Sequence, residues 1–216
     1  SILDWSYKVG LGFSKFISLG NKADLTEADF IADASEDSNT KVILCYIEDV
    51  ENGPHFLDVA RRASRKKPVI ILKSGTSQAG AQAASSHTGA LAGSDLAYET
   101  AFQQSGVIRA RNMPELFDLA VAFANQPVPQ GDRVAVITNS GGPGIVATDN
   151  IEDKNLKMAR FTKETVESLR NYLPAESNIY NPVDVLGDAK ADRFHFALQT
   201  VLADPGVDSA VVLVCP

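Results

Sequence analysis

Short runs of apolar residues recur along the chain at intervals that fit the strands of a sheet. The runs are FSKFISL (13–19), VILCYI (42–47), VIIL (69–72), VAVIT (134–138) and AVVLV (210–214). Most of them are continuous rather than strictly alternating, which is typical of strands covered by helices on both faces. We therefore predict strands at these runs and a mainly parallel arrangement.

Helical patterns with start signals fill the intervals between the runs. Thr26 and Asp29 have the spacing of a capping box, and Pro54 and Pro114 stand where the first turn of a helix tolerates proline. A further helix is expected after Ser94. Strands that alternate with helices indicate an α/β fold.

The polar segment NQPVPQGDR (125–133), with two prolines and a glycine, has the composition of a linker. It predicts two domains, residues 1–126 and 127–216.

The two halves of the chain resemble each other. LGNKADLTEADF (19–30) compares with LGDAKADRFHF (186–196), and each is followed by an acidic turn and an apolar run. On this register the second-half segment VAVITNSGGPG (134–144) has no counterpart after Ser1. We therefore expect a strand and a loop upstream of Ser1 and an interrupted strand at Pro216, so that both domains are truncated pieces of a longer protein.

Charge and cysteine content narrow the class of protein. The formal net charge of the 216 residues is −7 and the basic residues are scattered, which argues against a nucleic-acid surface. No apolar run is long enough to span a membrane, and no signal-peptide pattern opens the sequence. Cys45 and Cys215 lie in apolar runs, so we expect free thiols and a cytoplasmic location.

A glycine-rich loop follows the run 134–138 and leads into a helical pattern. Ser140, Gly141, Gly142 and Gly144 leave main-chain N–H groups at a helix start, where the helix dipole also favours an anion. The loop lacks the lysine of a nucleotide P-loop and the spacing of a dinucleotide fingerprint. It fits either a phosphate site or a plain tight turn.

The stretch SSHTGALAG (85–93) places a histidine among small residues. His87 follows fourteen small or polar residues, ending in Ser86, that leave the end of a predicted strand, where open α/β sheets bind ligands, and it precedes Thr88 and Gly89. An accessible imidazole there fits a nucleophile that carries a group between two sites. A loop histidine that caps a turn is the alternative.

Glu48 ends the run 42–47, at the same predicted sheet edge as the loop that holds His87. A carboxylate bonded to one ring nitrogen fixes the tautomer and leaves the other nitrogen free to attack. The alternative is a solvated acidic turn with Asp49 and Glu51. The polar run 73–76 likewise fits either a phosphate contact or ordinary loop polarity.

Five blocks in order carry a resemblance to a known family. They are GFSKFISLGNKADL, ARRASRKKPVIILKSG, SSHTGALAGSD, AVITNSGGPGIVATD and NPVDVLGDA. Together, almost from Ser1 to Pro216, the chain resembles the NDP-forming acyl-CoA synthetases of the ADP-forming acetate–CoA ligase type, which are similar to succinyl-CoA synthetase. The resemblance implies two flavodoxin-like, three-layer αβα domains.

The resemblance also implies an activity and its residues. Members convert a carboxylic acid, ATP and CoA reversibly into acyl-CoA, ADP and phosphate, through an acyl phosphate and a phosphohistidine. The match places the phosphohistidine at His87 and the carboxylate that steadies its ring at Glu48. One helix start that cradles the phosphoryl group matches Gly141, Gly142 and Gly144, and the other belongs to a loop expected before Ser1.

The remaining parts of such an enzyme are expected outside this chain. The resemblance implies a CoA-binding domain, an ATP-grasp domain or subunit that binds ATP or ADP with Mg²⁺, and an oligomer, with no activity for these residues alone. A second hypothesis is an acyl-CoA-sensing, synthetase-like region of a protein lysine acetyltransferase. A third is a phosphate- or nucleotide-binding scaffold. The acid, and the choice between ADP and GDP, stay open.

Overall fold

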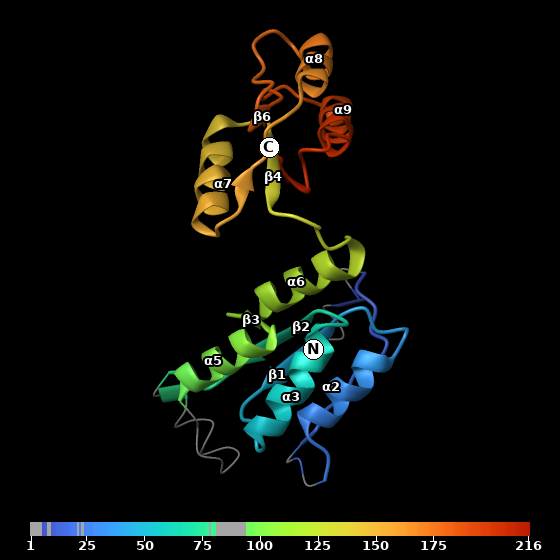
Figure 1. Cartoon of the computed structure of the whole chain (residues 1–216), viewed down its shortest axis with the longest axis vertical. Coiled ribbons are helices and arrows are strands. Elements are labelled where there is room, and N and C mark those ends of the chain that lie inside the picture. Colours follow the sequence, from blue (N-terminus) through green and yellow to red (C-terminus); the bar gives the residue numbers. More distant parts are fainter. Residues whose placement is uncertain (1–5, 8–9, 21, 23, 78, 81–93) are drawn as a thin grey trace. The chain divides into compact units, whose positions relative to one another are not determined.

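The chain forms two compact units, each with its own parallel sheet. The computed structural model describes residues 6–7, 10–20, 22, 24–77, 79–80 and 94–216. The units are Ser1–Pro127 and Val128–Pro216. Figure 1 shows helices packed around the strands in each unit.

Three parallel strands in the order β1-β2-β3 form the sheet of the first unit. They are β1 (Ile43–Ile47), β2 (Val69–Lys73) and β3 (Ile108–Ala110). The helices are α2 (Glu27–Glu36), α3 (Gly53–Ser64), α5 (Asp95–Ser105) and α6 (Met113–Asn125). Helices α2, α3 and α5 pack on one face of the sheet and α6 packs on the other, which makes three layers.

Strand β2 is the centre of this core, and all five of its residues are buried. Successive side chains of a strand point to opposite faces. Val69 and Ile71 accordingly pack against α2, α3 and α5, whereas Ile70 and Leu72 pack against α6. This burial on both faces is the reason that the run 69–72 shows no polar alternation.

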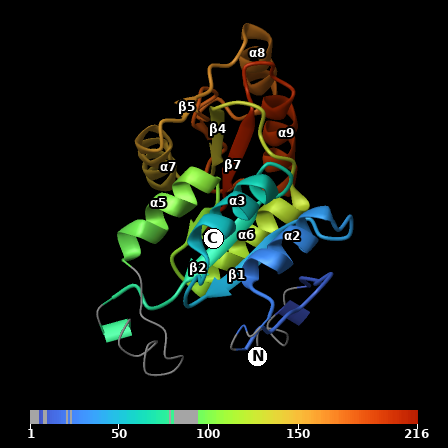
Figure 2. The ribbon, with the colours of Figure 1, turned by 60° about the horizontal axis from the view of Figure 1, so that its bottom comes forward.

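The second unit is centred on β4 (Arg133–Thr138). Strand β7 (Ser209–Leu213) pairs with it over five residues, and the short strands β5 (Lys157–Met158) and β6 (Val183–Asp184) pair with its two ends. Figure 2 shows β7 beside β4. Helix α7 (Gly141–Asp153) covers one face, and α8 (Lys163–Tyr172) and α9 (Ala191–Leu202) cover the other.

Asn181 completes the edge of β4 between β5 and β6. Its side-chain oxygen accepts from the N–H of Val136 at 2.8 Å, and its Nδ2 donates to the carbonyls of Val134 and Ala159 at 2.9 and 3.0 Å. One amide side chain thus replaces the main-chain partners that β4 lacks between the two short strands. The NPVD block therefore has a structural role in holding this sheet together.

Four of the five predicted strands are confirmed, as is the α/β class with parallel sheets. The prediction for 13–19 is wrong, because these residues form no strand and Phe16 and Ile17 are about half exposed. The repeat aligns Leu11 and Phe16 with Leu156 and Phe161, which flank β5. Strand β5 pairs with β4, and the described part of the first unit contains no equivalent of β4.

The helix start signals are confirmed. Thr26 and Asp29 form a capping box at α2, and the prolines predicted for α3 and α6 stand in their first turns behind the caps Asn52 and Asn112. In addition, each copy of the repeat leads into a helix and then a strand, which are α2 and β1 for the first copy and α9 and β7 for the second.

Both cysteines are free thiols. Burial, reinforced by the charge of Glu27, raises the pKa of Cys45 to about 12, so this thiol stays protonated at neutral pH. Among the described helices, none is both long and apolar enough to cross a membrane.

The first prediction concerns Asn181. Replacing it by aspartate keeps the shape but removes both N–H donors and places a carboxylate against two carbonyls. We expect the Asn181→Asp variant to lose about 2–4 kcal/mol in its free energy of unfolding. Urea unfolding followed by circular dichroism measures this loss.

Asn150→Asp is the matched control, because the Asn150 side chain bonds only Val146 O on the exposed surface of α7. Its free energy of unfolding should change by less than about 1 kcal/mol. Equal losses in the two variants would contradict the role assigned to Asn181.

Candidate functional site

In the first unit, Glu48 and Lys73 come together at the carboxyl edge of the sheet. Ile47 and Lys73 are paired across β1 and β2, and the N–H of Ser74 donates to Ile47 O at 3.0 Å. Glu48 is half-buried, and its Oε2 is shielded from solvent with no hydrogen-bond partner in the described part of the chain. A shielded carboxylate oxygen is ordinarily bonded, so Glu48 has the capacity to accept a further donor.

Lys22 fixes the turn that follows Glu48. Its Nζ donates to the main-chain oxygen and to Oδ1 of Asp49, both at 2.8 Å, and lies 3.1 Å from Oε2 of Glu27. Burial acts to lower the pKa of Lys22, but the hydrogen bonds to the two carboxylates outweigh burial and raise it. Lys22 therefore stays charged and ties the residues after β1 to the start of α2.

Tyr98 links the ends of β1 and β2 to α5. Its hydroxyl accepts from the N–H of Val50 at 3.1 Å, and Nζ of Lys73 lies 4.6 Å from the centre of its ring. This distance is that of a cation–π contact.

Arg109 of β3 holds α5 by ion pairs with two of its residues, Asp95 at 2.5 Å and Glu99 at 2.7 Å. The hydrogen bond to Asp95 is the largest influence on the pKa of Arg109, which is raised. The first turns of α5 are thereby held against the sheet.

His87 lies outside the described residues, as do Ser86, Thr88 and Gly89, so their roles stay predictions. The other two histidines are exposed, His55 on α3 and His195 on α9. Along the sequence, the segment that contains His87 leaves β2 after Lys73 and enters α5 at Asp95. Both of these flanking residues belong to the edge where Glu48 lies.

In the second unit, the predicted glycine loop forms the start of α7. Ser140 is the N-cap, and its main-chain N–H and carbonyl both bond the hydroxyl of the buried Thr138, at 3.0 and 2.9 Å. Gly141 and Gly142 are exposed, and a helix leaves the N–H groups of its first turn without main-chain partners. These residues offer two main-chain donors and the positive end of a helix dipole to an anion.

Gly144 has a different role from Gly142. A Cβ atom at Gly144 would lie 3.1 Å from Cγ2 of Thr138 and 3.7 Å from Cβ of Pro182, whereas one at Gly142 would meet nothing within 4 Å. Gly144 therefore permits α7 to approach β4, and Gly142 leaves the loop open.

Asp184 is a polar residue beside this loop that the sequence reasoning did not single out. Its Oδ1 accepts from the N–H of Leu186 at 2.9 Å, and its Oδ2 lies 3.9 Å from the position of a Cβ on Gly141. In the sequence, the feature that marks Asp184 is a carboxylate directly after the apolar pair Pro182 and Val183 of the NPVD block.

The ends of β4 and β7 are joined at the same edge. Asn139 Nδ2 donates to Cys215 O, and Cys215 N–H donates to Asn139 Oδ1, both at 2.8 Å. This paired contact holds the residue that precedes the glycine loop.

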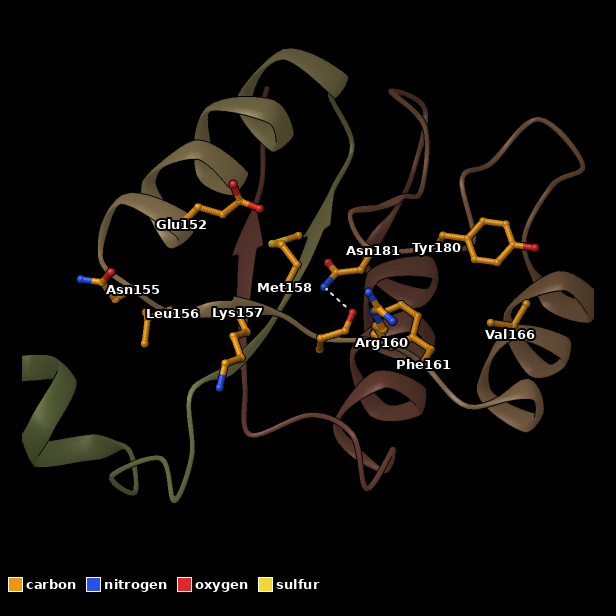
Figure 3. A pocket seen from close by; sticks show the side chains of 11 residues that line it. Glu152, Asn155, Leu156, Lys157, Met158, Arg160, Phe161, Val166, Tyr180 and Asn181 are labelled. Carbon is orange, nitrogen blue, oxygen red and sulfur yellow. Dashed lines mark hydrogen bonds between the residues drawn. The ribbon is translucent and has the colours of Figure 1, made fainter.

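A separate pocket of about 730 Å³ opens near the other end of α7 (Figure 3). It is lined by Glu152, Asn155, Leu156, Lys157, Met158, Ala159, Arg160, Phe161, Val166, Tyr180 and Asn181. Glu152 belongs to the last turn of α7, whereas the glycine loop begins that helix. The pocket is therefore distinct from the predicted phosphate loop.

No metal cluster is found among the residues that the structure describes: no three His, Cys, Asp or Glu side chains there are grouped to hold an ion.

Comparison with known families matches both units. Residues 1–123 match the succinyl-CoA ligase like flavodoxin domain, and residues 134–214 match the ligase-CoA domain. The flavodoxin-like architecture predicted from the sequence is thus confirmed.

Curated relatives include two archaeal enzymes. The ADP-forming acetate–CoA ligase I of Archaeoglobus fulgidus is 49% identical over 216 residues, which is all of this chain and 31% of the relative. The α subunit of the ADP-forming acetate–CoA ligase II of Pyrococcus furiosus is 46% identical over 95% of this chain and 45% of the relative. The chain thus spans less than half of either relative.

A solved structure is also similar over the whole chain. It is the dinucleotide-forming acetyl-coenzyme A synthetase 1 of Ca. Korarchaeum cryptofilum in complex with phosphate and ADP. The TM-score is 0.93 at 36% identity, and the match covers 100% of this chain and 47% of that one.

The second prediction separates the two glycines of the α7 start. Alanine gains a similar helix propensity at either position, so the difference between Gly144→Ala and Gly142→Ala isolates the contact with Thr138 and Pro182. We expect Gly144→Ala to be less stable than Gly142→Ala by about 1 kcal/mol. Urea unfolding of both variants measures the difference, and equal stabilities would show that α7 does not require glycine for its approach.

Proposed function

The chain belongs to the family of NDP-forming acyl-CoA synthetases, and we propose that it is the phosphoryl-carrying part of an enzyme that converts a carboxylic acid, ATP and CoA into acyl-CoA, ADP and phosphate. The observation that carries the proposal is the shielded Oε2 of Glu48, which has no hydrogen-bond partner among the described residues. It lies at the sheet edge from which the segment with the proposed nucleophile His87 leaves β2.

In the ATP-forming direction, a ring nitrogen of His87 attacks the phosphorus of an acyl phosphate. The N–P bond forms while the P–O bond to the acyl group breaks, and the carboxylate leaves. The phosphoryl group then passes to ADP, which restores the imidazole. Glu48 accepts a hydrogen bond from the N–H of the other ring nitrogen, which keeps the attacking nitrogen unprotonated and stabilises the ring while it bears positive charge.

The start of α7 is proposed as a station for the phosphoryl group. Ser140, Gly141, Gly142 and Gly144 form a helix start at which Gly141 and Gly142 are exposed and offer their main-chain N–H groups, whereas the N–H groups of Ser140 and Gly144 are bonded within the protein. Helix termini stabilise a nearby anion by about 0.3–1 kcal/mol through the dipole alone. Such modest stabilisation suits a carrier that must release its cargo in both directions. The phosphate and ADP complex of the Ca. Korarchaeum relative supports these ligands.

The remaining functions of the enzyme are assigned to other domains or a partner subunit. Relatives are two to three times longer than this chain, and the Pyrococcus furiosus relative is one subunit of its enzyme. We propose that these parts bind CoA and the nucleotide with Mg²⁺, that the enzyme is oligomeric and cytoplasmic, and that the 216 residues alone do not catalyse the complete reaction.

The third prediction tests the nucleophile. The intact enzyme, incubated with radiolabelled ATP and Mg²⁺, should form an acid-labile, base-stable phosphoprotein. His87→Ala should abolish both the label and ligase activity. His55→Ala and His195→Ala are matched controls, since both side chains are exposed on helices, and both variants should be labelled normally. Labelling of His87→Ala at the parent level would refute the assignment.

The fourth prediction tests the carboxylate. Glu48→Gln keeps the shape but removes the charge, so the rate of phosphoprotein formation should fall by about tenfold to a hundredfold, while the protein stays folded. Glu51→Gln, at an exposed position three residues later, should leave the rate unchanged. Rapid-quench labelling measures the rates, and similar behaviour of the two variants would count against Glu48.

A further inference from the structure

Lys73 is a buried cation without an ion-pair partner in the described part of the chain. Lys73 is the last residue of β2 and is 5% exposed. Its Nζ donates to the carbonyl of its neighbour Ser74 and lies over the ring of Tyr98, and no described carboxylate stands within 4.0 Å of it. Buried charges are usually paired or bound to a ligand, because removing an ion from water is costly.

Two half-buried basic side chains of the first unit are already neutralised. Lys22 is paired with Asp49 and Glu27, and Arg109 is paired with Asp95 and Glu99. Lys73 is therefore, among the residues that the structure describes, a buried base at this edge that makes no direct ion pair and interacts with Asp95, Asp49 and Glu48 only at longer range. Burial lowers the pKa of Lys73, which marks an ammonium group that a second charge would stabilise.

An anion at this edge requires such a cation. Glu48 and Asp49 already place two carboxylates after β1, and a phosphoryl group brings roughly two further negative charges. Without a compensating positive charge, a phosphoryl dianion beside Glu48 would be repelled. A lysine held on an aromatic ring supplies that charge at a defined position.

We propose that Lys73 binds a phosphoryl dianion at the carboxyl edge of the first sheet, beside Glu48, and that Tyr98 positions Lys73 for this contact. The dianion is either free phosphate or a phosphoryl group carried by the protein. This inference rests on the proposed function, because it assumes that phosphoryl transfer takes place at this edge.

The fifth prediction compares three variants of the intact enzyme. Lys73→Met keeps the length of the side chain and removes the charge, whereas Lys73→Arg keeps the charge. Lys66→Met removes an exposed lysine that pairs with Glu36 and serves as the control. The KM for free phosphate in the ATP-forming direction and the rate of phosphoprotein formation from radiolabelled ATP are measured for each, so that the two sources of the dianion are distinguished.

We expect Lys73→Met to raise the KM for phosphate, or to slow phosphoprotein formation, by about tenfold or more, which is the loss of one charge-assisted hydrogen bond. Lys73→Arg should stay within about threefold of the parent and Lys66→Met within about twofold. Unchanged values in Lys73→Met, or equal changes in Lys66→Met, would overturn the proposal.

If Lys73→Met fails to fold, the pH dependence of phosphate binding tests the proposal instead. Phosphate binding to the parent should weaken as pH rises through the lowered pKa of Lys73, because the ammonium then loses its proton. The charged and titratable groups around Lys73 are Glu48, Asp49, Asp95, Tyr98 and Arg109. Burial raises the pKa of Tyr98, so its ionisation comes later.

Lys73→Arg should abolish this alkaline weakening, because arginine stays charged. An identical alkaline profile in Lys73→Arg would reject Lys73 as the phosphate ligand. The His87→Ala labelling experiment separates the two levels of inference. Parent-level labelling of His87→Ala refutes the proposed function. If His87→Ala loses its label but Lys73→Met has normal kinetics, only the role of Lys73 is refuted.

Discussion

Burial of a central parallel strand on both faces is the constraint on which the rest of each unit depends. Strands β2 and β4 are covered by helices on both sides, so their side chains are almost entirely apolar until the strand ends. Polar groups that act together therefore emerge where the strands end, and parallel pairing brings those ends to one edge. Glu48 and Lys73 in the first unit, and Ser140 and Asp184 in the second, follow this rule.

The two units present different chemistry at equivalent edges. The first unit gathers charged side chains, whose desolvation is offset by ion pairs at Lys22 and Arg109 and by an aromatic ring at Lys73. The second presents main-chain N–H groups at the start of α7, which carry no net charge and cost little to expose.

The internal similarity of the sequence corresponds to the same order of helix and strand in the two units. Helix α2 leads into β1 and helix α9 into β7, and both strands are parallel to the central strand of their unit. The second unit adds β4 and α7, for which the described first unit has no equivalent. This difference explains why the residues around β5 pair with a neighbour, whereas the aligned residues 13–19 do not form a strand.

The sequence by itself determined the α/β class, the long strands and the helix starts, because apolar runs and caps such as Thr26 act within a few residues. It also pointed to Glu48 and His87, whose roles both stay predictions. Only the tertiary structure decided that 13–19 is not a strand and that Asn181 bonds the edge of β4 between β5 and β6. It also decided that Lys73 is buried with no carboxylate of the described residues within 4.0 Å. Strand pairing and charge compensation depend on residues distant in the chain, and a local pattern does not contain them.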